Sequence, residues 1–214
     1  MATHRRRMPA AQRREVILAA AEDTFADLGY HGASLDEIAH SAGVSKALIY
    51  EHFVSKRALH ASLLNHHAGE IFERLKAGAQ TGETGEERLR SGIDAFLGFV
   101  EEHRAAWRAL FRDSAEPDVA DLICAVQAQA TVVIAGLIAA DAEVGGEPGD
   151  DPALRAMRIE IYAQLLSGAV QSVATWWHGH PEVPRDVLVD RAMEFCWHGV
   201  ERMPGRRAPV SSTG

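Results

Sequence analysis

The sequence has only two cysteines and lacks a secretory signal. Cys124 and Cys196 both lie in strongly apolar stretches. This setting predicts small buried residues in a reducing cytoplasm, and it argues against a disulfide framework or a thiolate metal site. The early apolar run at 16–21 is too short for a signal peptide, and Glu22 and Asp23 follow it at once. We therefore expect a cytoplasmic protein.

Motifs of enzyme chemistry are also missing. The sequence contains no nucleophile elbow, phosphate-binding loop or zinc-protease motif, so we expect neither catalysis nor a cofactor. An enzyme on a helical scaffold would need converging titratable groups, whereas the 11 histidines are scattered. The adjacent His66 and His67 cannot share one helix face, and His178 and His180 have no acidic or thiol ligand beside them. We expect no metal site.

Patterns typical of β-strands are absent, because no alternation of apolar and polar residues persists along the chain. Apolar residues instead recur at helical spacing, for example at Ile17, Ala21, Phe25 and Leu28. Glycine and proline mark the breaks between these segments, and Gly29 ends the first. The sequence therefore predicts an all-α fold of about nine helices.

Two stretches, 122–140 and 161–177, contain no charged residue. The first is long enough to suggest a membrane span, but it holds two glutamines and a threonine and is bounded by Asp121 and Asp141. We therefore expect no membrane contact. A helix that is apolar all round must be buried on more than one side, so one of these stretches is expected at the centre of a domain.

The second uncharged stretch predicts a homodimer. A domain of this size has little room for another fully surrounded helix, so we expect burial against a second copy of the chain. Small residues such as Gly168 and Ala174 allow another helix to come close. Residues 153–177 and 184–203 should form a four-helix contact, with the interface at Leu165, Ala169, Ser172, Val173, Trp176, Met193 and Trp197.

The net charge of −8 is unevenly distributed along the chain. The first 60 residues have a slight excess of basic residues, whereas the remainder is acidic. One end can therefore approach phosphate groups while the acidic body keeps the protein soluble. Arg5, Arg6 and Arg7 precede the first helix, either as a disordered tail or as an arm that follows phosphates into the minor groove.

The segment from Ser34 to Phe53 reads SLDEIAHSAGVSKALIYEHF and predicts a helix-turn-helix. Ser34 and Glu37 form a capping box that begins the first helix. Gly43 supplies the positive backbone angle that a tight turn between two crossed helices requires, and Ser45 can cap the second helix. This arrangement leaves four side chains of the second helix turned outward, at Lys46, Ala47, Tyr50 and His52. A plain helical hairpin with a solvated face is the alternative.

The longer run from Leu18 to Leu64 resembles the DNA-binding domain of the TetR (tetracycline-repressor) family. Matching positions include Phe25, Gly29, Gly43, Tyr50 and Phe53. The resemblance implies that the second helix of the motif lies in the DNA major groove and reads bases, with these residues as candidates: Ser45, Lys46, Ala47 and Tyr50. It further implies phosphate contacts at Ser34, His52 and Lys56.

From the motif and the resemblance we expect three parts. Residues 1–54 form the helix-turn-helix domain with its basic arm, 55–203 form a larger helical domain for ligand binding and dimerisation, and 204–214 form a disordered tail. The resemblance implies an effector pocket in the larger domain, although each aromatic residue there could equally be core. The proposed lining residues are His67, Phe96, Phe99, Trp107, Phe111, Gln127 and Tyr162.

The predicted function is that of a homodimeric repressor, which binds a double-stranded DNA operator of pseudo-palindromic sequence and is released by a small, mostly apolar or aromatic effector. Filling the pocket would change the separation of the two recognition helices. An architectural DNA-binding protein without an effector is the main rival. Such a protein would bind with little sequence preference and would lack an enclosed cavity.

Overall fold

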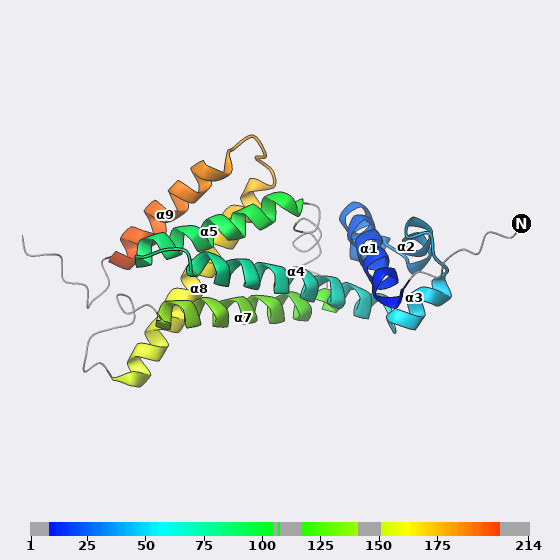
Figure 1. Cartoon of the computed structure of the whole chain (residues 1–214), viewed down its shortest axis with the longest axis horizontal. Coiled ribbons are helices and arrows are strands. Elements are labelled where there is room, and N and C mark those ends of the chain that lie inside the picture. The colour runs from blue at the N-terminus through cyan, green and yellow to red at the C-terminus, as the bar shows by residue number, and fades with distance from the viewer. Residues whose placement is uncertain (1–8, 105–106, 108–116, 141–150, 202–214) are drawn as a thin grey trace, which may run out of the picture. The chain divides into compact units, whose positions relative to one another are not determined.

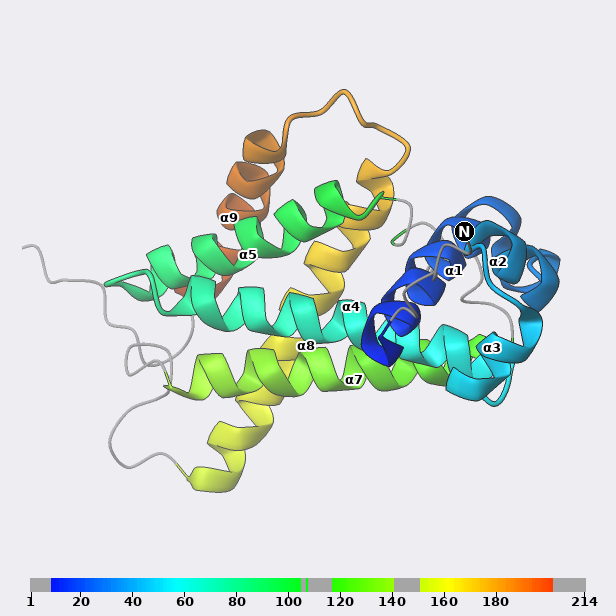
Figure 2. The same ribbon diagram turned by 45° about the vertical axis from the view of Figure 1, so that its right-hand side comes forward.

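The computed structural model describes residues 9–104, 107, 117–140 and 151–201 (Figure 1). Within these ranges all regular structure is α-helical, which confirms the all-α prediction. The helices are α1 (Ala10–Gly32), α2 (Leu35–Ser41), α3 (Lys46–His52), α4 (Lys56–Ala79), α5 (Gly85–Glu102), α7 (Pro117–Ala140), α8 (Pro152–Trp177) and α9 (Arg185–Glu201). Figure 2 shows the same helices from a second direction.

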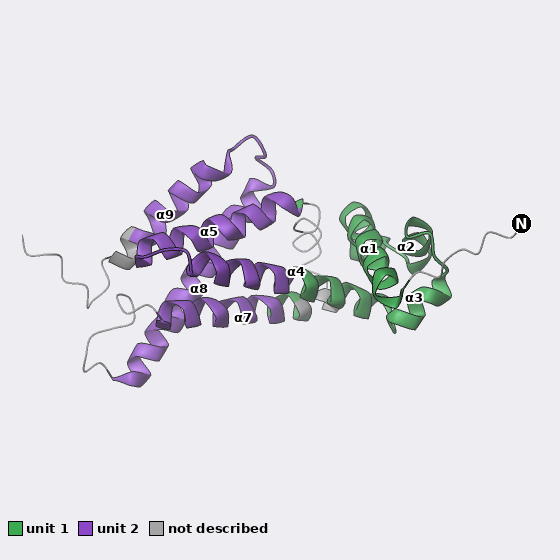
Figure 3. Ribbon diagram, in the orientation of Figure 1, with its two compact units in different colours: residues 1–67, 104–124 green, residues 68–103, 125–214 purple. Residues whose placement is uncertain are grey.

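The chain divides into two compact units (Figure 3). Residues 1–67 and 104–124 form the first unit, and residues 68–103 and 125–214 form the second. The division falls inside α4, which begins in the first unit and ends in the second. The predicted arginine arm, Phe111 and the tail at 204–214 lie outside the described residues.

The first unit has its own hydrophobic core. Ile17 and Phe25 of α1, Ile38 of α2, Ile49 of α3 and Leu59 of α4 are all fully buried. Burying a side chain of this size stabilises a fold by roughly 1.5–3 kcal/mol. Each short helix therefore depends on its buried residues, three in α2 and one in α3, because seven residues alone do not form a stable helix.

Gly29 interrupts α1 three residues before the helix ends at Gly32. Its φ of 73° and ψ of 172° lie in a region that residues with a Cβ atom rarely adopt. The predicted break at Gly29 is therefore present, and a further helical turn, Tyr30–Gly32, follows it. This turn places the Tyr30 ring against Phe25, with the ring centroids 6.0 Å apart.

In the second unit, α5 packs against α9 and α8 contacts both. Leu97 of α5, and Ala163 and Trp177 of α8, are almost completely buried there. Arg185, the first residue of α9, bonds to Asp94 at 3.0 Å and to Glu101 at 3.2 Å. A Cβ atom at Gly98 would lie 2.9 Å from the Arg185 guanidinium.

The sequence predicted that one uncharged stretch would lie at the buried centre of a domain. The first of these stretches, which lies on α7, is not buried in this way. Only 11% of the apolar segment Ile123–Ala140 on α7 is buried within the chain, and Val132 is 70% exposed. Cys124 is also exposed rather than buried. By length and composition alone this is the one described helix that could span a membrane, which is weak evidence for a span. An uncharged sequence indicates that a helix is shielded from water, but it does not indicate whether residues of the same chain or of another molecule provide the shielding.

Candidate nucleic-acid interface

The first helix of the predicted motif begins with a complete capping box. The Ser34 hydroxyl accepts a hydrogen bond from the Glu37 amide at 3.2 Å, and the Glu37 carboxylate accepts one from the Ser34 amide at 2.8 Å. The Ser34 hydroxyl also donates to this carboxylate at 2.8 Å. The predicted capping box is therefore present, and its carboxylate occupies the groups of Ser34 that a DNA phosphate would bind.

The turn between α2 and α3 depends on Gly43. Its φ is 63°, and the following Val44 amide donates to the carbonyl of Ala39 at 3.0 Å. A Cβ atom at Gly43 would have nothing within 4 Å, so the backbone angle alone favours glycine here. Ser45 then caps α3 by accepting a hydrogen bond from the Leu48 amide at 3.2 Å.

One side of α3 is anchored and the other is exposed. Ile49 is fully buried and Phe53, directly after the helix, is 4% exposed. Tyr50 is 51% exposed, and the other predicted reading residues, Ser45, Lys46 and Ala47, are exposed as well. We call these four residues the reading face. His52 is half-buried, which makes it less accessible than the reading face.

A salt bridge joins the reading face to α2. The Lys46 ammonium lies 2.7 Å from the Asp36 carboxylate, and both side chains are largely exposed. The hydrogen bond to Asp36 raises the pKa of Lys46 above its ordinary value. Sequence analysis missed this pair, because Asp36 and Lys46 are ten residues apart and belong to different helices.

Lys56, a predicted phosphate contact, bonds to the end of α1. Its ammonium donates to the carbonyl oxygens of Tyr30 at 2.7 Å and Ala33 at 3.0 Å. The same ammonium lies 4.5 Å from the centre of the Tyr30 ring. Lys56 therefore ties the beginning of α4 to the last turn of α1, and one of its three N–H donors remains for another acceptor.

The predicted effector residues divide between the two units. His67 and Trp107 belong to the first, and both are buried. His67 lies 3.4 Å from the Glu22 carboxylate. Phe96, Phe99, Gln127 and Tyr162 belong to the second unit. Phe99 is fully buried, and the other three are half-buried.

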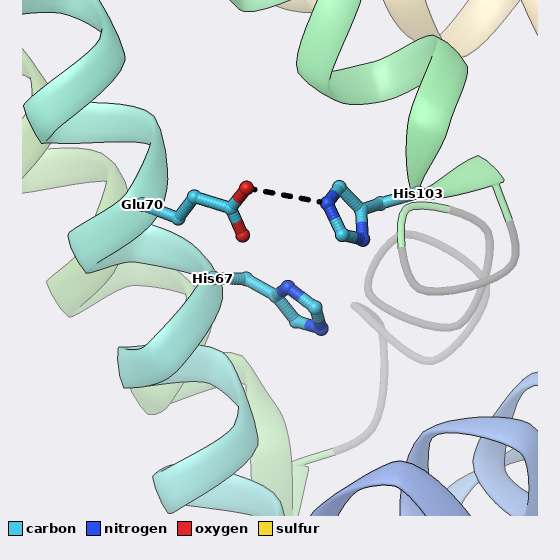
Figure 4. A group of neighbouring side chains, drawn as sticks. All are labelled: His67, Glu70 and His103. Atoms are coloured by element: carbon cyan, nitrogen blue, oxygen red, sulfur yellow. Dashed lines mark ion pairs between the residues drawn. The ribbon is translucent and has the colours of Figure 1, made fainter.

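Phe99 is enclosed by a charged cluster at the end of α5. Its ring stacks on His103 at 4.5 Å, and the Arg74 guanidinium lies 5.5 Å from its centre. Arg74 also bonds to Glu70 and Glu102, each at 2.6 Å, which raises the pKa of Arg74 and lowers that of Glu102. Figure 4 shows Glu70 paired with His103 at 3.5 Å, and His67 one turn earlier on α4. Because His103 and Arg74 both pack on its ring, Phe99 is a core residue of this cluster.

The predicted dimer residues differ in exposure. Leu165 and Trp176 of α8 are 64% and 49% exposed, and Ser172 is exposed beside the half-buried Ala169 and Val173. On α9, Trp197 is half-buried. Met193 is only 3% exposed in the single chain, and its contact with a partner stays a prediction. Its side chain faces the interior of its own chain, because α9 packs against α5.

A groove of about 340 Å³ lies along α5 and α9 of the second unit. Two salt bridges form part of its wall, Arg90 with Asp190 at 2.8 Å and Arg191 with Glu194. Glu86, Met193 and Trp197 complete the lining. None of the predicted effector residues belongs to it.

Comparison with known proteins gives matches along most of the chain. Residues 17–63 match the family model described as bacterial regulatory proteins, tetR family, and residues 86–199 match a tetracyclin repressor-like C-terminal domain. The transcriptional activator FasR of Mycolicibacterium smegmatis is 31% identical over 205 residues, which cover 94% of this chain and 89% of FasR.

Two solved structures are similar to the whole fold. A TetR-like regulator from Rhodococcus sp. RHA1 has a TM-score of 0.71 and 28% identity, covering 92% of this chain and all of its own. The regulator FadR of Bacillus subtilis, solved in complex with stearoyl-CoA, has a TM-score of 0.65 and 20% identity, covering 85% and 96%. The matched ranges include the helix-turn-helix and the helices after it. This chain therefore belongs to the TetR family, whose members are DNA-binding transcriptional regulators and not enzymes.

Proposed function

We propose that this protein is a homodimeric regulator that binds a pseudo-palindromic operator through two copies of α3 and leaves it when an apolar effector binds. The reading face is the observation on which the proposal rests. Its four residues are exposed on a helix held from behind by Ile49 and Phe53, and capped at its start by Ser45. A side chain that enters the major groove needs this combination of exposure and rigid support.

The dimer part of the proposal rests on α8 and α9. Both helices present large apolar side chains to solvent in the single chain: Leu154, Met157, Ile161, Leu165 and Trp176 on α8, and Phe195, which is 75% exposed, on α9. Large exposed apolar groups on neighbouring helices are typical of a protein–protein contact. Two-fold symmetry would present the reading faces to half-sites about 34–36 Å apart, one turn of the duplex.

The DNA part is tested with duplexes that the wild-type protein selects from a randomised pool. Tyr50→Ala should weaken binding about tenfold or more, because loss of a well-placed base contact costs roughly 1–3 kcal/mol. Val54→Ala is the matched control, since Val54, two residues after the end of α3, is 86% exposed but lies outside the reading face. Equal affinity of the wild type and Tyr50→Ala would contradict the assignment of α3. Equal affinity for selected and mixed-sequence duplexes would favour an architectural protein.

We assign the effector to the second unit, with Phe96, Gln127 and Tyr162 as its contacts. These side chains are half-buried on α5, α7 and α8, so each combines partial shielding with an accessible edge. FadR of Bacillus subtilis, which shares the fold, binds stearoyl-CoA. A long acyl chain also suits the uncharged stretches 122–140 of α7 and 161–177 of α8. Stearoyl-CoA is therefore the first probe.

The effector acts through α4, the helix that begins in the first unit and ends in the second. A ligand can change DNA affinity only if it binds two arrangements of the protein with different free energies. In the same DNA assay, stearoyl-CoA should release the duplex and free coenzyme A should not. Tyr162→Ala should keep full DNA affinity and need more stearoyl-CoA for release. Release at unchanged concentration would contradict the assignment of Tyr162.

The direction of regulation depends on where the operator lies. FasR is named as an activator, so family membership does not by itself make this protein a repressor. We propose repression, exerted in the cytoplasm where the chromosome lies, for an operator that overlaps a promoter.

A further inference from the structure

The helix-turn-helix is poor in positive charge for a surface that binds DNA. From Ser34 to Phe53 the sequence contains one lysine, Lys46, no arginine and three acidic residues, Asp36, Glu37 and Glu51. Phosphate contacts contribute most of the affinity of a protein for DNA, and they need cationic or N–H donors. The bonding of Lys46 therefore matters more than that of any other charged group in the motif.

In the free protein the Lys46 ammonium is already paired. It lies 2.7 Å from the Asp36 carboxylate, and the exposed fractions of the two side chains are 45% and 69%. Asp36 lies in the first turn of α2, where its negative charge is stabilised by the helix dipole. Both side chains are exposed, so the lysine can leave Asp36 without stranding a buried charge.

We propose that Asp36 competes with DNA for Lys46 and so limits the affinity of the reading face. Its carboxylate supplies oxygen acceptors for the Lys46 ammonium, as the anionic oxygens of a DNA phosphate or the neutral O6 carbonyl of a guanine edge would. Binding must break the pair at each half-site and bring the freed carboxylate close to the phosphate backbone. Both effects oppose binding, and both act most strongly on weak, non-specific complexes that gain no base contacts in return.

The effect of Asp36 should be moderate and dependent on salt. Exposed ion pairs are worth little, so Asp36→Asn should tighten binding of one half-site by roughly two- to fivefold at low salt. Raising the salt concentration should reduce this gain, because exposed charges are screened over about 10 Å at 0.1 M and about 3 Å at 1 M. Mixed-sequence DNA should gain at least as much as the selected duplex, which lowers the ratio between them.

The experiment compares five full-length proteins by fluorescence anisotropy: wild type, Asp36→Asn, Glu51→Gln, Lys46→Gln and the double variant Asp36→Asn/Lys46→Gln. The probes are a labelled duplex selected by the wild type and a mixed-sequence duplex. Glu51→Gln is the matched control, because it removes the same charge from the motif at an exposed residue away from Lys46. Asp36→Asn should bind more tightly than both the wild type and Glu51→Gln. Adding Asp36→Asn to Lys46→Gln should increase DNA affinity clearly less than adding it to the wild type.

Three results would overturn the inference. They are unchanged or weaker binding by Asp36→Asn, an equal gain from Glu51→Gln, or an undiminished gain in the Lys46→Gln background. The inference rests on the proposed DNA reading by α3. Failure of the wild type to select any duplex would refute that function and this inference together. Normal selection without the Asp36→Asn gain would refute the inference alone.

Discussion

At the scale of single residues, Lys56 combines a predicted contact to DNA with a structural role inside the protein. The family resemblance implies a phosphate contact, whereas the structure shows its ammonium on the carbonyl oxygens of Tyr30 and Ala33 and over the Tyr30 ring. These carbonyls lie after the break at Gly29, at the C-terminal end of α1, where the carbonyl groups of a helix need partners from outside it. Lys56 therefore stabilises the end of α1 whether or not it also reaches DNA.

We predict that Lys56→Gln lowers the free energy of unfolding by about 1–2 kcal/mol, since hydrogen bonds from charged groups are worth more than neutral ones. Urea denaturation measures this change. Arg57→Gln is the control, because the salt bridge of Arg57 to Asp121 at 3.0 Å is exposed and its loss should cost about 0–1 kcal/mol. If Lys56 also binds phosphate, Lys56→Gln will reduce the slope of log affinity for DNA against log salt concentration by about 1, the value for one phosphate contact. Unchanged stability would contradict the structural role.

At the scale of elements, the motif depends on how its two short helices begin and turn. Side-chain caps start both α2 and α3, and Gly43 turns the chain between them. The second unit contains a useful contrast in Gly69, within α4. A Cβ atom at either glycine would have nothing within 4 Å, so the two differ in backbone conformation and not in available space.

Alanine substitution should therefore have opposite effects at the two glycines. Gly43→Ala should lower stability by about 1–2 kcal/mol, because the left-handed conformation is costly for a residue with a Cβ atom. Gly43→Asn should cost less, since asparagine tolerates that conformation. Gly69→Ala should raise stability by roughly 0.5–1 kcal/mol, because alanine favours a helix more than glycine does. Thermal and urea unfolding provide both values, and equal effects at the two positions would contradict the explanation.

At the scale of the whole molecule, apolar surface remains uncovered in a single chain. It lies on α8 and α9, and also on α7, where Val132 is 70% exposed. We assign the dimer contact to α8 and α9, where the exposed apolar residues are joined by small ones such as Ser172. α7 and α8 each contain a long uncharged stretch, and the assignment of the contact to α8 rather than α7 can be tested directly.

Ala169→Arg and Leu165→Arg should convert the dimer to monomers, because each would place an unpaired charge inside the contact. Sedimentation velocity measures the result, and operator affinity should fall with it. Val132→Arg on α7 is the matched control and should leave the dimer intact. Loss of the dimer only in Val132→Arg would move the contact to α7.

The sequence by itself determined the features that depend on neighbours along the chain. Helical periodicity predicted the all-α fold, and the spacing of Ser34, Glu37, Gly43 and Ser45 predicted the caps and the turn. Such features are predictable because their hydrogen bonds and backbone angles involve residues three or four positions apart. The family followed from the same local motif.

Only the tertiary structure decided which residues from distant positions meet. It paired Lys46 with Asp36, tied Lys56 to the end of α1, buried Met193 against its own chain and left the uncharged segment Ile123–Ala140 of α7 largely exposed. A pattern of apolar and charged residues records that a side chain needs a partner. It does not record whether the partner comes from the same helix, another helix or another molecule, because contacts between helices depend on how the helices pack in space.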